Sequence, residues 1–382
     1  MKHIAGSILT PQGFVSGVLE LAPDGRIAHI RGEPLSEHQA RHANAPLVLP
    51  GFIDLHVHGG GGYDIMQGAD AVQRVSELHA QHGTTALLAT TMTAPMADLD
   101  MAFAALHTHG LSRSSAGARV LGVHLEGPYI SPDKLGAQPD FTRPMALAEL
   151  QRWHQQFPIR LITLAPEVPG HMDLIGSLVG AGFRVQLGHS TGSYEDGKQA
   201  LDRGAGGFTH LFNAMTGLHH RAPGLVGAAL AHAQYAEIIP DLIHVHPGAM
   251  RVALRAIAGL YCVTDSTAAA GMPDGEYRLG RHSVTKCLGG VRLADGTLAG
   301  STLTMDQALR NLVNELGLTL SEASQRVSTH AANYLGLSDR GRLVAQAWGD
   351  AVLLDRDLKL LDVWVEGRSI ERAPNLNRSS LP

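Results

Sequence analysis

The sequence predicts an α/β fold, a (β/α)8 TIM-type barrel with a small β-sandwich domain formed by both ends of the chain. Eight short apolar runs recur between residues 51 and 266. Segments with helical periodicity lie between them, and several of these end in glycine, a common helix stop. Such regular alternation is typical of a parallel sheet covered by helices.

The two ends of the chain have a different pattern from its middle. Residues 3–10 and 17–30 read as short strands, with the Asp24-Gly25 pair as a hairpin turn. Residues 350–371 read as two further strands around a polar turn. We therefore expect a small β-sandwich domain from residues 1–48 and 343–382, beside a barrel domain from residues 49–342.

The barrel strands are expected at eight positions along the chain. A doubly wound open sheet is the alternative, but it usually carries a G-x-G-x-x-G phosphate loop after its first strand, and "HVHGGGGYD" does not supply that pattern. The predicted strands are 51–57, 84–90, 119–126, 159–167, 183–189, 206–212, 237–245 and 261–266. The predicted helices are 70–83, 144–157, 171–183, 193–204, 246–260, 304–317 and 320–336.

Composition narrows the possible partners. The 382 residues have a net charge of −5 and no basic block, which argues against nucleic acid or an anionic membrane surface as a partner. No apolar run approaches the length of a membrane span, and the N-terminus does not read as a signal peptide. Only two cysteines occur, which favours a reducing cytoplasm. The 22 histidines are unusual and point to metal or proton chemistry.

Metal-binding and titratable side chains recur where the predicted strands end. His56 and His58 lie at positions i and i+2 of one strand, so both rings point to the same face. The glycines 59–62 that follow are expected to leave room for a metal and a substrate. Barrel enzymes carry their chemistry at these strand ends. The other five such residues are Glu126, His189, His210, His244 and Asp265.

Imidazole and carboxylate ligands suit a divalent metal, Zn²⁺ first, with Fe²⁺, Mn²⁺ and Co²⁺ left open. Each residue taken alone also has a structural explanation: a lone histidine can be a hydrogen-bonded core residue, Glu126 a helix cap, and Asp265 a turn carboxylate. Seven further histidines in helical or loop contexts are expected to be solvated or structural: His79, His82, His107, His109, His154, His219 and His220.

Several motifs together resemble the amidohydrolase superfamily. They include "PGFIDLHVHG", "GVHLEGPYIS", "LGHS" and "VTDSTAAAGMPDGEYRLG", and they run from about Pro50 to Val313. "HLEGP" followed by "THLFNAM" resembles, more narrowly, the family of N-acetylglucosamine-6-phosphate deacetylases. The resemblance implies metal-assisted hydrolysis of an acetamide in amino-sugar catabolism, with an amino-sugar phosphate as the small-molecule partner.

The resemblance also implies roles for individual residues. Glu126, His189 and His210 would hold the principal metal. His56 and His58 would hold a second one, bridged by Glu126, as in the family members that have two; other members bind a single ion, so one or two ions per subunit are implied. Asp265 would act as the catalytic acid and base. Arg221 would reach into the site of a neighbouring subunit, so a homodimer is expected. The substrate-binding residues would be Ala137, Gln138, Asn213, Ala214, Arg221, Asp241, Leu242, Ile243, His244, Leu298, Ala299 and Gly300.

Two positions depart from the family pattern. Gln138 stands where the family often has a histidine, and glutamine donates a hydrogen bond but carries no positive charge. Leu242 stands where glycine is frequent. Other readings therefore stay open: a deacetylase of N-acetylgalactosamine 6-phosphate or an unphosphorylated N-acetyl amino sugar, an enzyme for an N-acyl amino acid or cyclic ureide, or a non-catalytic metal-binding scaffold.

Overall fold

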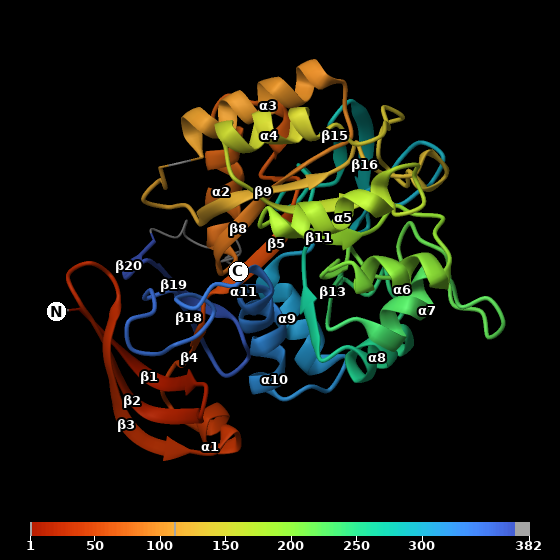
Figure 1. The fold of residues 1–382 in the computed structure, drawn as a ribbon. Helices are drawn as coiled ribbons and strands as arrows, with labels where there is room; N and C mark the ends of the chain where they lie inside the picture. The colour runs from red at the N-terminus through yellow and green to blue at the C-terminus, as the bar shows by residue number, and fades with distance from the viewer. Residues whose placement is uncertain (1, 111, 371–382) are drawn as a thin grey trace.

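The computed structural model describes residues 2–110 and 112–370, and eight parallel strands form the centre of its larger part (Figure 1). Six of them pair in the order β12-β11-β10-β9-β8-β5, and β13 pairs with β14. A parallel bridge between Val57 and Ser266 brings the segment after β14 back to β5. The strands are β5 (Phe52–Val57), β8 (Thr84–Thr91), β9 (Arg119–Glu126), β10 (Ile159–Leu164), β11 (Arg184–Leu187), β12 (Gly207–Phe208), β13 (Tyr235–Ile238) and β14 (Gly259–Cys262).

Helices lie around the outside of these strands (Figure 1). Those from α2 to α8 connect successive barrel strands, as parallel neighbours require, and α9 to α11 follow the last strand. Their bounds are α2 (Ala71–Gln81), α3 (Met96–His109), α4 (Leu147–Gln156), α5 (His171–Gly180), α6 (Tyr194–Asp202), α7 (Gly224–His232), α8 (Pro247–Ala256), α9 (Met305–Asn314), α10 (Leu320–Ser324) and α11 (His330–Leu335), with the π-helix η3 (Gln325–Thr329) between the last two. Two short 3₁₀ helices are η1 (Ile65–Gln67) and η2 (Pro132–Lys134).

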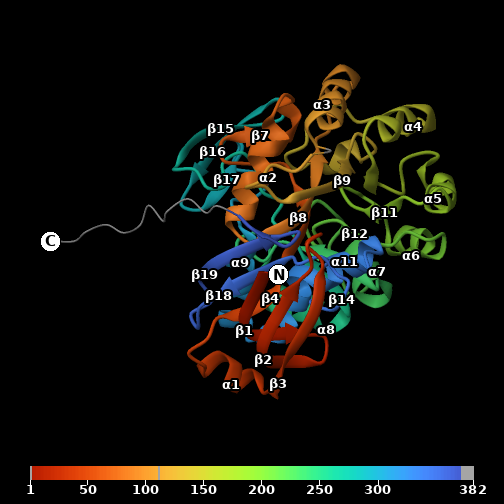
Figure 2. The ribbon, with the colours of Figure 1, turned by 90° about the vertical axis from the view of Figure 1, so that its left-hand side faces the viewer.

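The two ends of the described chain share one mixed sheet. Its strand order is β20-β19-β18-β4-β1-β2-β3, so N-terminal and C-terminal strands lie side by side (Figures 1 and 2). The hairpin expected at Asp24-Gly25 joins β2 to β3. The bounds are β1 (Lys2–Thr10), β2 (Gly13–Leu21), β3 (Ile27–Leu35), β4 (Leu47–Pro50), β18 (Ala351–Leu354), β19 (Leu360–Val365) and β20 (Arg368–Ser369), with α1 (Glu37–His42) after β3.

The predicted fold class is confirmed by this arrangement of a parallel barrel and a separate sheet from both chain ends. The division into domains at residues 48/49 and 342/343 stays a prediction, and its residues 371–382 lie outside the described part. A small three-stranded sheet, β15 (Gly275–Leu279), β16 (His282–Cys287) and β17 (Gly290–Arg292), and the short pair β6 (Gly59–Gly60) and β7 (Tyr63–Asp64) complete the strands.

The structure differs from the sequence prediction at several elements. The last four barrel strands end earlier than predicted, at Leu187, Phe208, Ile238 and Cys262. The residues predicted on their ends therefore lie in the loops that follow: His189, His210, His244 and Asp265. Helices α3 and α7 were not predicted; α7 is apolar nearly throughout and buried over Leu225–Ala229, so it carries no polar face to reveal its period. Within the described residues, no helix is both long and apolar enough to cross a lipid bilayer.

Candidate active site and metal centre

A cavity of about 220 Å³ opens where the barrel strands end, and we call this region the mouth. It collects residues that lie far apart in the sequence, from His58 to Gly300, as a barrel does at the C-terminal ends of its strands. Its lining residues are His58, Met92, Glu126, Gly136, Ala137, Gln138, His189, His210, Asn213, Ala214, His244, Asp265, Leu279, Thr297, Leu298 and Gly300.

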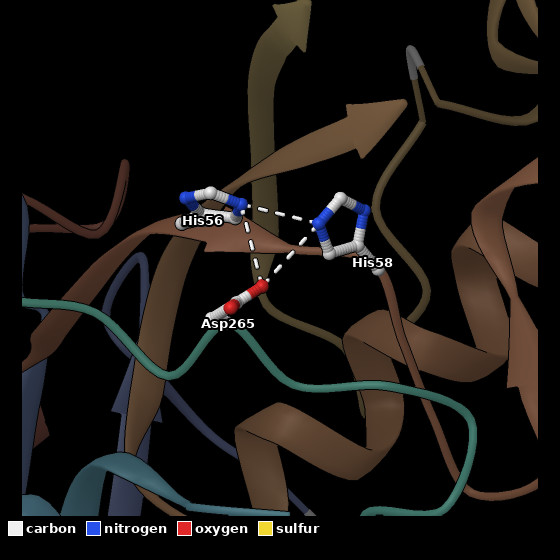
Figure 3. Close-up of side chains that lie close together, drawn as sticks. All are labelled: His56, His58 and Asp265. Atoms are coloured by element: carbon white, nitrogen blue, oxygen red, sulfur yellow. Dashed lines mark hydrogen bonds and ion pairs between the residues drawn. The ribbon is translucent and has the colours of Figure 1, made fainter. Parts of the chain in front are cut away.

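His56, His58 and Asp265 form the first group of close ligand atoms (Figure 3). His56 lies on β5 and His58 directly follows its last residue, and their i, i+2 spacing turns the rings to one side. Their Nε2 atoms are 3.1 Å apart. The Asp265 Oδ1 atom lies 3.4 Å from Nε2 of His56 and 3.3 Å from Nε2 of His58.

Glu126, His189 and His210 form the second group. The Glu126 Oε1 atom lies 3.1 Å from Nε2 of each of these two histidines. Its other oxygen, Oε2, lies 3.1 Å from Nε2 of His58 and 3.4 Å from Nε2 of His56. The Glu126 carboxylate therefore stands between the two groups, with one oxygen toward each.

The donor atoms fit divalent ions. The Nδ1 atom of His189 faces the Lys134 carbonyl at 2.8 Å, and that of His56 faces the Glu237 carboxylate at 3.0 Å. Both partners only accept, so Nδ1 carries the proton and Nε2 of a neutral ring carries a lone pair. The Nε2 lone pair of His189 points toward Nε2 of His210, 3.0 Å away, and Nδ1 of His210 has no hydrogen-bond partner among the described residues. Ligand atoms around a tetrahedral ion are about 3.3 Å apart, close to these separations.

Both carboxylates of the mouth favour the ionised state. Burial by itself would raise the pKa of Glu126, but His56 and His189, which are positively charged when they carry a second proton and no metal, outweigh it and hold that pKa well below the ordinary value. Burial likewise opposes ionisation of Asp265, and His56 and His58 reverse the effect and lower its pKa. An ionised Asp265 is the form that can accept a proton.

The backbone of the mouth is strained to bring these side chains together. Asp265 has φ of +50° and His210 has φ of +28°, values that side chains other than glycine rarely adopt. Asp54 supports the segment before Asp265 by accepting hydrogen bonds from the backbone and hydroxyl of Thr264. Gly300 has φ of +61°, and a side chain there would meet Thr267 and the carbonyl of Asp265.

The structure gathers most predicted substrate residues around the cavity. Ala137, Gln138, Asn213, Ala214, His244, Leu298 and Gly300 line it. Asp241 lies behind His244 and fixes it, because its Oδ2 atom is 2.6 Å from Nδ1 of that ring. Leu242 and Ile243 line a neighbouring surface hollow instead, and Ala299 is fully buried. Arg221 is exposed on a loop, with its guanidinium 2.7 Å from His220.

The role expected for the glycines after β5 is corrected. A side chain at Gly59 would collide with the backbone of Tyr63 and Ala268, and one at Gly60 with Leu78 of α2. These glycines therefore make room for neighbouring chain segments, and none of them lines the cavity. Gln138 has a defined place: its Nε2 donates to Glu126 Oε2 at 2.6 Å.

Sequence reasoning missed two residues beneath the mouth. Glu237 and His124 are fully buried and, with His56, form a third group of close ligand atoms. His124 stands two residues before Glu126, the same i, i+2 spacing that singled out His56 and His58, so that signal was available. Glu237 is an acid inside the apolar run that forms β13, which was a second signal. Burial and the neighbouring His56 hold the pKa of His124 well below its ordinary value, so this ring stays neutral.

Comparison with known proteins agrees with this geometry. Residues 47–370 match the model of the amidohydrolase family. An N-acetylgalactosamine-6-phosphate deacetylase of Escherichia coli O157:H7 is 39% identical over 377 residues, 96% of this chain and 99% of that protein. An N-acetylglucosamine-6-phosphate deacetylase of Lysinibacillus sphaericus is 38% identical over 90% of this chain and 91% of its own length.

Solved structures give the same result. An N-acetylglucosamine-6-phosphate deacetylase from Thermotoga maritima superposes with a TM-score of 0.88 at 31% identity, covering 97% of this chain and 100% of that one. A variant enzyme from Mycobacterium smegmatis, in complex with N-acetyl-D-glucosamine-6-phosphate, has a TM-score of 0.87 at 34% identity with the same coverage. The family match spans the whole barrel and both ligand groups, and this chain belongs to the amidohydrolase family.

Proposed function

We propose that this chain is a metal-dependent deacetylase that hydrolyses N-acetyl-D-glucosamine 6-phosphate to D-glucosamine 6-phosphate and acetate. The observation that carries the proposal is the position of the Asp265 carboxylate, which lines the cavity within 3.4 Å of His56 and His58. A scaffold that merely stores a metal has no use for such a group. Relatives named for this reaction cover most of the chain, which supports the same substrate class.

The residues of the mouth divide the work of amide hydrolysis. A bound divalent ion would lower the pKa of a water and polarise the acetyl oxygen. Asp265 takes a proton from the attacking water and passes it to the amine nitrogen as the C–N bond breaks. His244, fixed by Asp241, and Asn213 present polar groups to the sugar phosphate from the cavity wall.

Two metal ions per subunit are proposed, Zn²⁺ first, with Fe²⁺, Mn²⁺ or Co²⁺ as alternatives. The two ligand groups and the position of Glu126 between them support this number. Metal analysis of protein purified under metal-replete conditions should approach two equivalents, and the double variant His56→Asn, His58→Asn should fall toward one. An intact protein that never exceeds one equivalent would remove the second ion.

A second candidate substrate is N-acetylgalactosamine 6-phosphate. It is favoured by the relative of that name, which matches 96% of this chain at 39% identity. The test is acetate release from both 6-phosphates and from both unphosphorylated sugars, each with and without chelator. We expect the glucosamine derivative to give the highest kcat/KM. A preference for the galacto epimer would replace the substrate and keep the reaction, whereas no chelator-sensitive release from any of the four would overturn the proposal.

Arg221 is proposed to hold the 6-phosphate of a neighbouring subunit's substrate in a homodimer. Its guanidinium is exposed and lies outside this chain's own cavity, and a planar fork of donors matches phosphate. Losing one charged hydrogen bond should lower kcat/KM by about ten- to a hundredfold. Arg221→Ala should show that loss on the phosphorylated sugar and almost none on the unphosphorylated one. Equal losses would separate Arg221 from the phosphate.

We also propose a cytoplasmic location for the protein and a division of the chain into two domains. Cys262 and Cys287 are both unpaired, and the second is exposed, which favours a reducing compartment such as the cytoplasm. The seven-stranded sheet holds its own small core around Ile8 and Leu19, which supports treating the chain ends as a separate domain.

A further inference from the structure

Glu237 lies on β13, fully buried beneath the mouth and outside the cavity. Its Oε2 atom is 3.0 Å from Nδ1 of His56 and 3.1 Å from the backbone nitrogen of His210. One carboxylate oxygen therefore touches a member of each of the two ligand groups. A buried carboxylate with two such neighbours is satisfied by N–H donors, and both of these atoms can supply one.

The contact with His56 selects a tautomer. A carboxylate only accepts, so the proton of a neutral His56 ring stays on Nδ1 and the lone pair on Nε2. Nε2 is the atom that faces His58, Glu126 and Asp265. A histidine that donates one ring N–H to a carboxylate is held in orientation and becomes a stronger ligand through its other nitrogen.

The contact with His210 holds a strained backbone. His210 has φ of +28°, and such a conformation persists only where its surroundings over-determine it. Its N–H donates to the Glu237 side chain, and the next N–H, of Leu211, donates to the Glu237 carbonyl at 2.9 Å. Side chain and backbone of one residue thus fix the segment that carries a ligand of the second group.

The Glu237 carboxylate is itself held in place by hydrogen bonds on the side away from the mouth. Tyr261 donates its hydroxyl to Glu237 Oε1 at 3.4 Å, and Gln186 donates its amide to that hydroxyl at 2.5 Å. Thr209 donates to the Gln186 carbonyl at 3.1 Å. This chain of hydrogen bonds crosses the buried barrel interior, so Glu237 has no freedom to turn toward another partner.

We propose that Glu237 is a positioning residue for the metal centre, which orients His56 for binding through Nε2 and anchors the backbone of His210. The inference rests on the metal part of the proposed function and is independent of the sugar. The competing reading is that His56, His124 and Glu237 hold a third ion, since these three also lie close enough. That reading makes Glu237 a ligand and predicts an additional metal equivalent.

The test is Glu237→Gln, which keeps the shape, removes the charge and can present an amide N–H₂ to Nδ1. Zn²⁺ affinity is measured by competition with a chromophoric chelator, and Co²⁺ absorption spectra report the coordination of each ion. Loss of such a partner typically weakens metal affinity about 10- to 100-fold. We expect that loss and an altered Co²⁺ spectrum at the His56 group, and a smaller loss at the His210 group. No substrate enters this measurement, so a wrong sugar cannot change its outcome.

The matched control is Glu366→Gln, the same chemical change at a largely buried carboxylate far from the mouth. It should leave both Zn²⁺ affinities and the Co²⁺ spectrum as in the wild type. If Glu237→Gln does not fold, Glu237→Asp keeps the charge and withdraws it by one methylene, and should give a smaller loss of the same kind. Wild-type affinity in the folded Glu237 variant would overturn the proposal, as would a third metal equivalent in the wild type that disappears with Glu237.

Discussion

Two of the clusters of buried charge among the described residues are built in opposite ways. At the mouth, every ion pair that Glu126 and Asp265 make among the described residues is with a histidine. At the seam between the barrel and the seven-stranded sheet, the Glu366 carboxylate accepts hydrogen bonds from Nε and Nη2 of Arg119, both at 2.8 Å. Arg340 reaches the same carboxylate at 2.6 Å and also pairs with Asp350.

The difference lies in where the counter-charge comes from. The guanidinium groups of the seam are permanent charges that belong to the chain, so the cluster is complete by itself. The imidazoles of the mouth are neutral ligands or proton carriers, and their lone pairs converge beside the carboxylates. A cluster that lacks a permanent cation of its own is one that can take a metal ion. The contrast separates a functional group of charges from a structural one.

The mouth and the seam also differ in backbone conformation. Eleven non-glycine residues among those described have positive φ. Six of them lie in the loops around the mouth: His189, His210, Phe212, Ala214, Leu242 and Asp265. At the seam, one of the five charged residues has a positive φ, namely Glu366. The other four are Arg113, Arg119, Arg340 and Asp350. Strain of this kind concentrates where side chains must converge on one point.

The largest expected effect is at Asp265. Removal of a general acid and base typically costs about 10²–10⁴-fold in rate, so Asp265→Asn should lose nearly all kcat. Its melting temperature and the ion held by Glu126, His189 and His210 should stay close to the wild type, so a thermal melt should be unchanged and metal analysis should give at least one equivalent. The seam variant Glu366→Gln should keep wild-type kcat. An Asp265→Asn enzyme with a tenth of normal activity would remove this residue from the reaction.

Removing the metal should lower the free energy of unfolding through the loss of ligands at the mouth, and it should not affect the ion pairs of the seam. A ligand that binds only the folded state at 1,000 times its Kd adds about 4 kcal/mol to the free energy of unfolding. Excess chelator should therefore lower the Tm of the wild type markedly, and zinc should restore it. In the double variant His56→Asn, His58→Asn the shift should be smaller. Identical melts with and without chelator would show that no ion contributes to folding.

The third prediction concerns the seam and pH. Burial opposes ionisation of Glu366, but Arg119 and Arg340 outweigh it and lower its pKa from 4.5 to about 2. A lowered carboxyl pKa gives stability that is fully present above the unfolded value and lost as pH falls toward the folded one. Glu366→Gln should cost about 3 kcal/mol at pH 7, in the range for a broken buried pair.

Denaturant unfolding at several pH values checks this. The difference between wild type and Glu366→Gln should shrink as pH falls from 4.5 toward 2, the window set by the two pKa values. Chelator should change both proteins equally, since the seam carries its own counter-charges. A difference that is independent of pH would mean that the Glu366 side chain stabilises by packing and not by charge.

The sequence predicted those parts of the fold and the site in which residue types recur at a regular spacing. Eight apolar runs matched eight strands because buried parallel strands are continuously apolar. The i, i+2 spacing of His56 and His58 gave their shared face, and barrel topology placed Glu126, His189 and His210 near them. The remaining positions depend on contacts between distant segments, which no local pattern contains.

Three failures illustrate that limit. Helix α7 was missed because a helix buried on most sides has no polar stripe. His244 was assigned to a strand because the apolar run continues past Ile238, where the chain leaves the sheet. Glu237 was passed over because its meaning depends on His56, which is 181 positions away in the sequence.

The smallest expected effect is the strain at Leu242, in the loop after β13. Leu242 has φ of +68°, which costs a residue with a Cβ atom about 1–2 kcal/mol and costs glycine almost nothing. Comparing Leu242→Gly with wild type alone would mix this relief with the loss of a partly buried side chain. Leu242→Ala removes the same packing and keeps the strain, so the pair of variants isolates the backbone.

We expect Leu242→Gly to be more stable than Leu242→Ala by about 0.5–1 kcal/mol, because the entropy that glycine loses on folding offsets part of the relief. Urea unfolding of the two variants measures this difference. The sign of this stability difference is informative, because at a site with an ordinary negative φ the alanine variant is more stable than the glycine variant. An alanine variant that equals or exceeds the glycine variant would mean that the loop relaxes at no cost, and that the mouth is less strained at this position than its φ angle indicates.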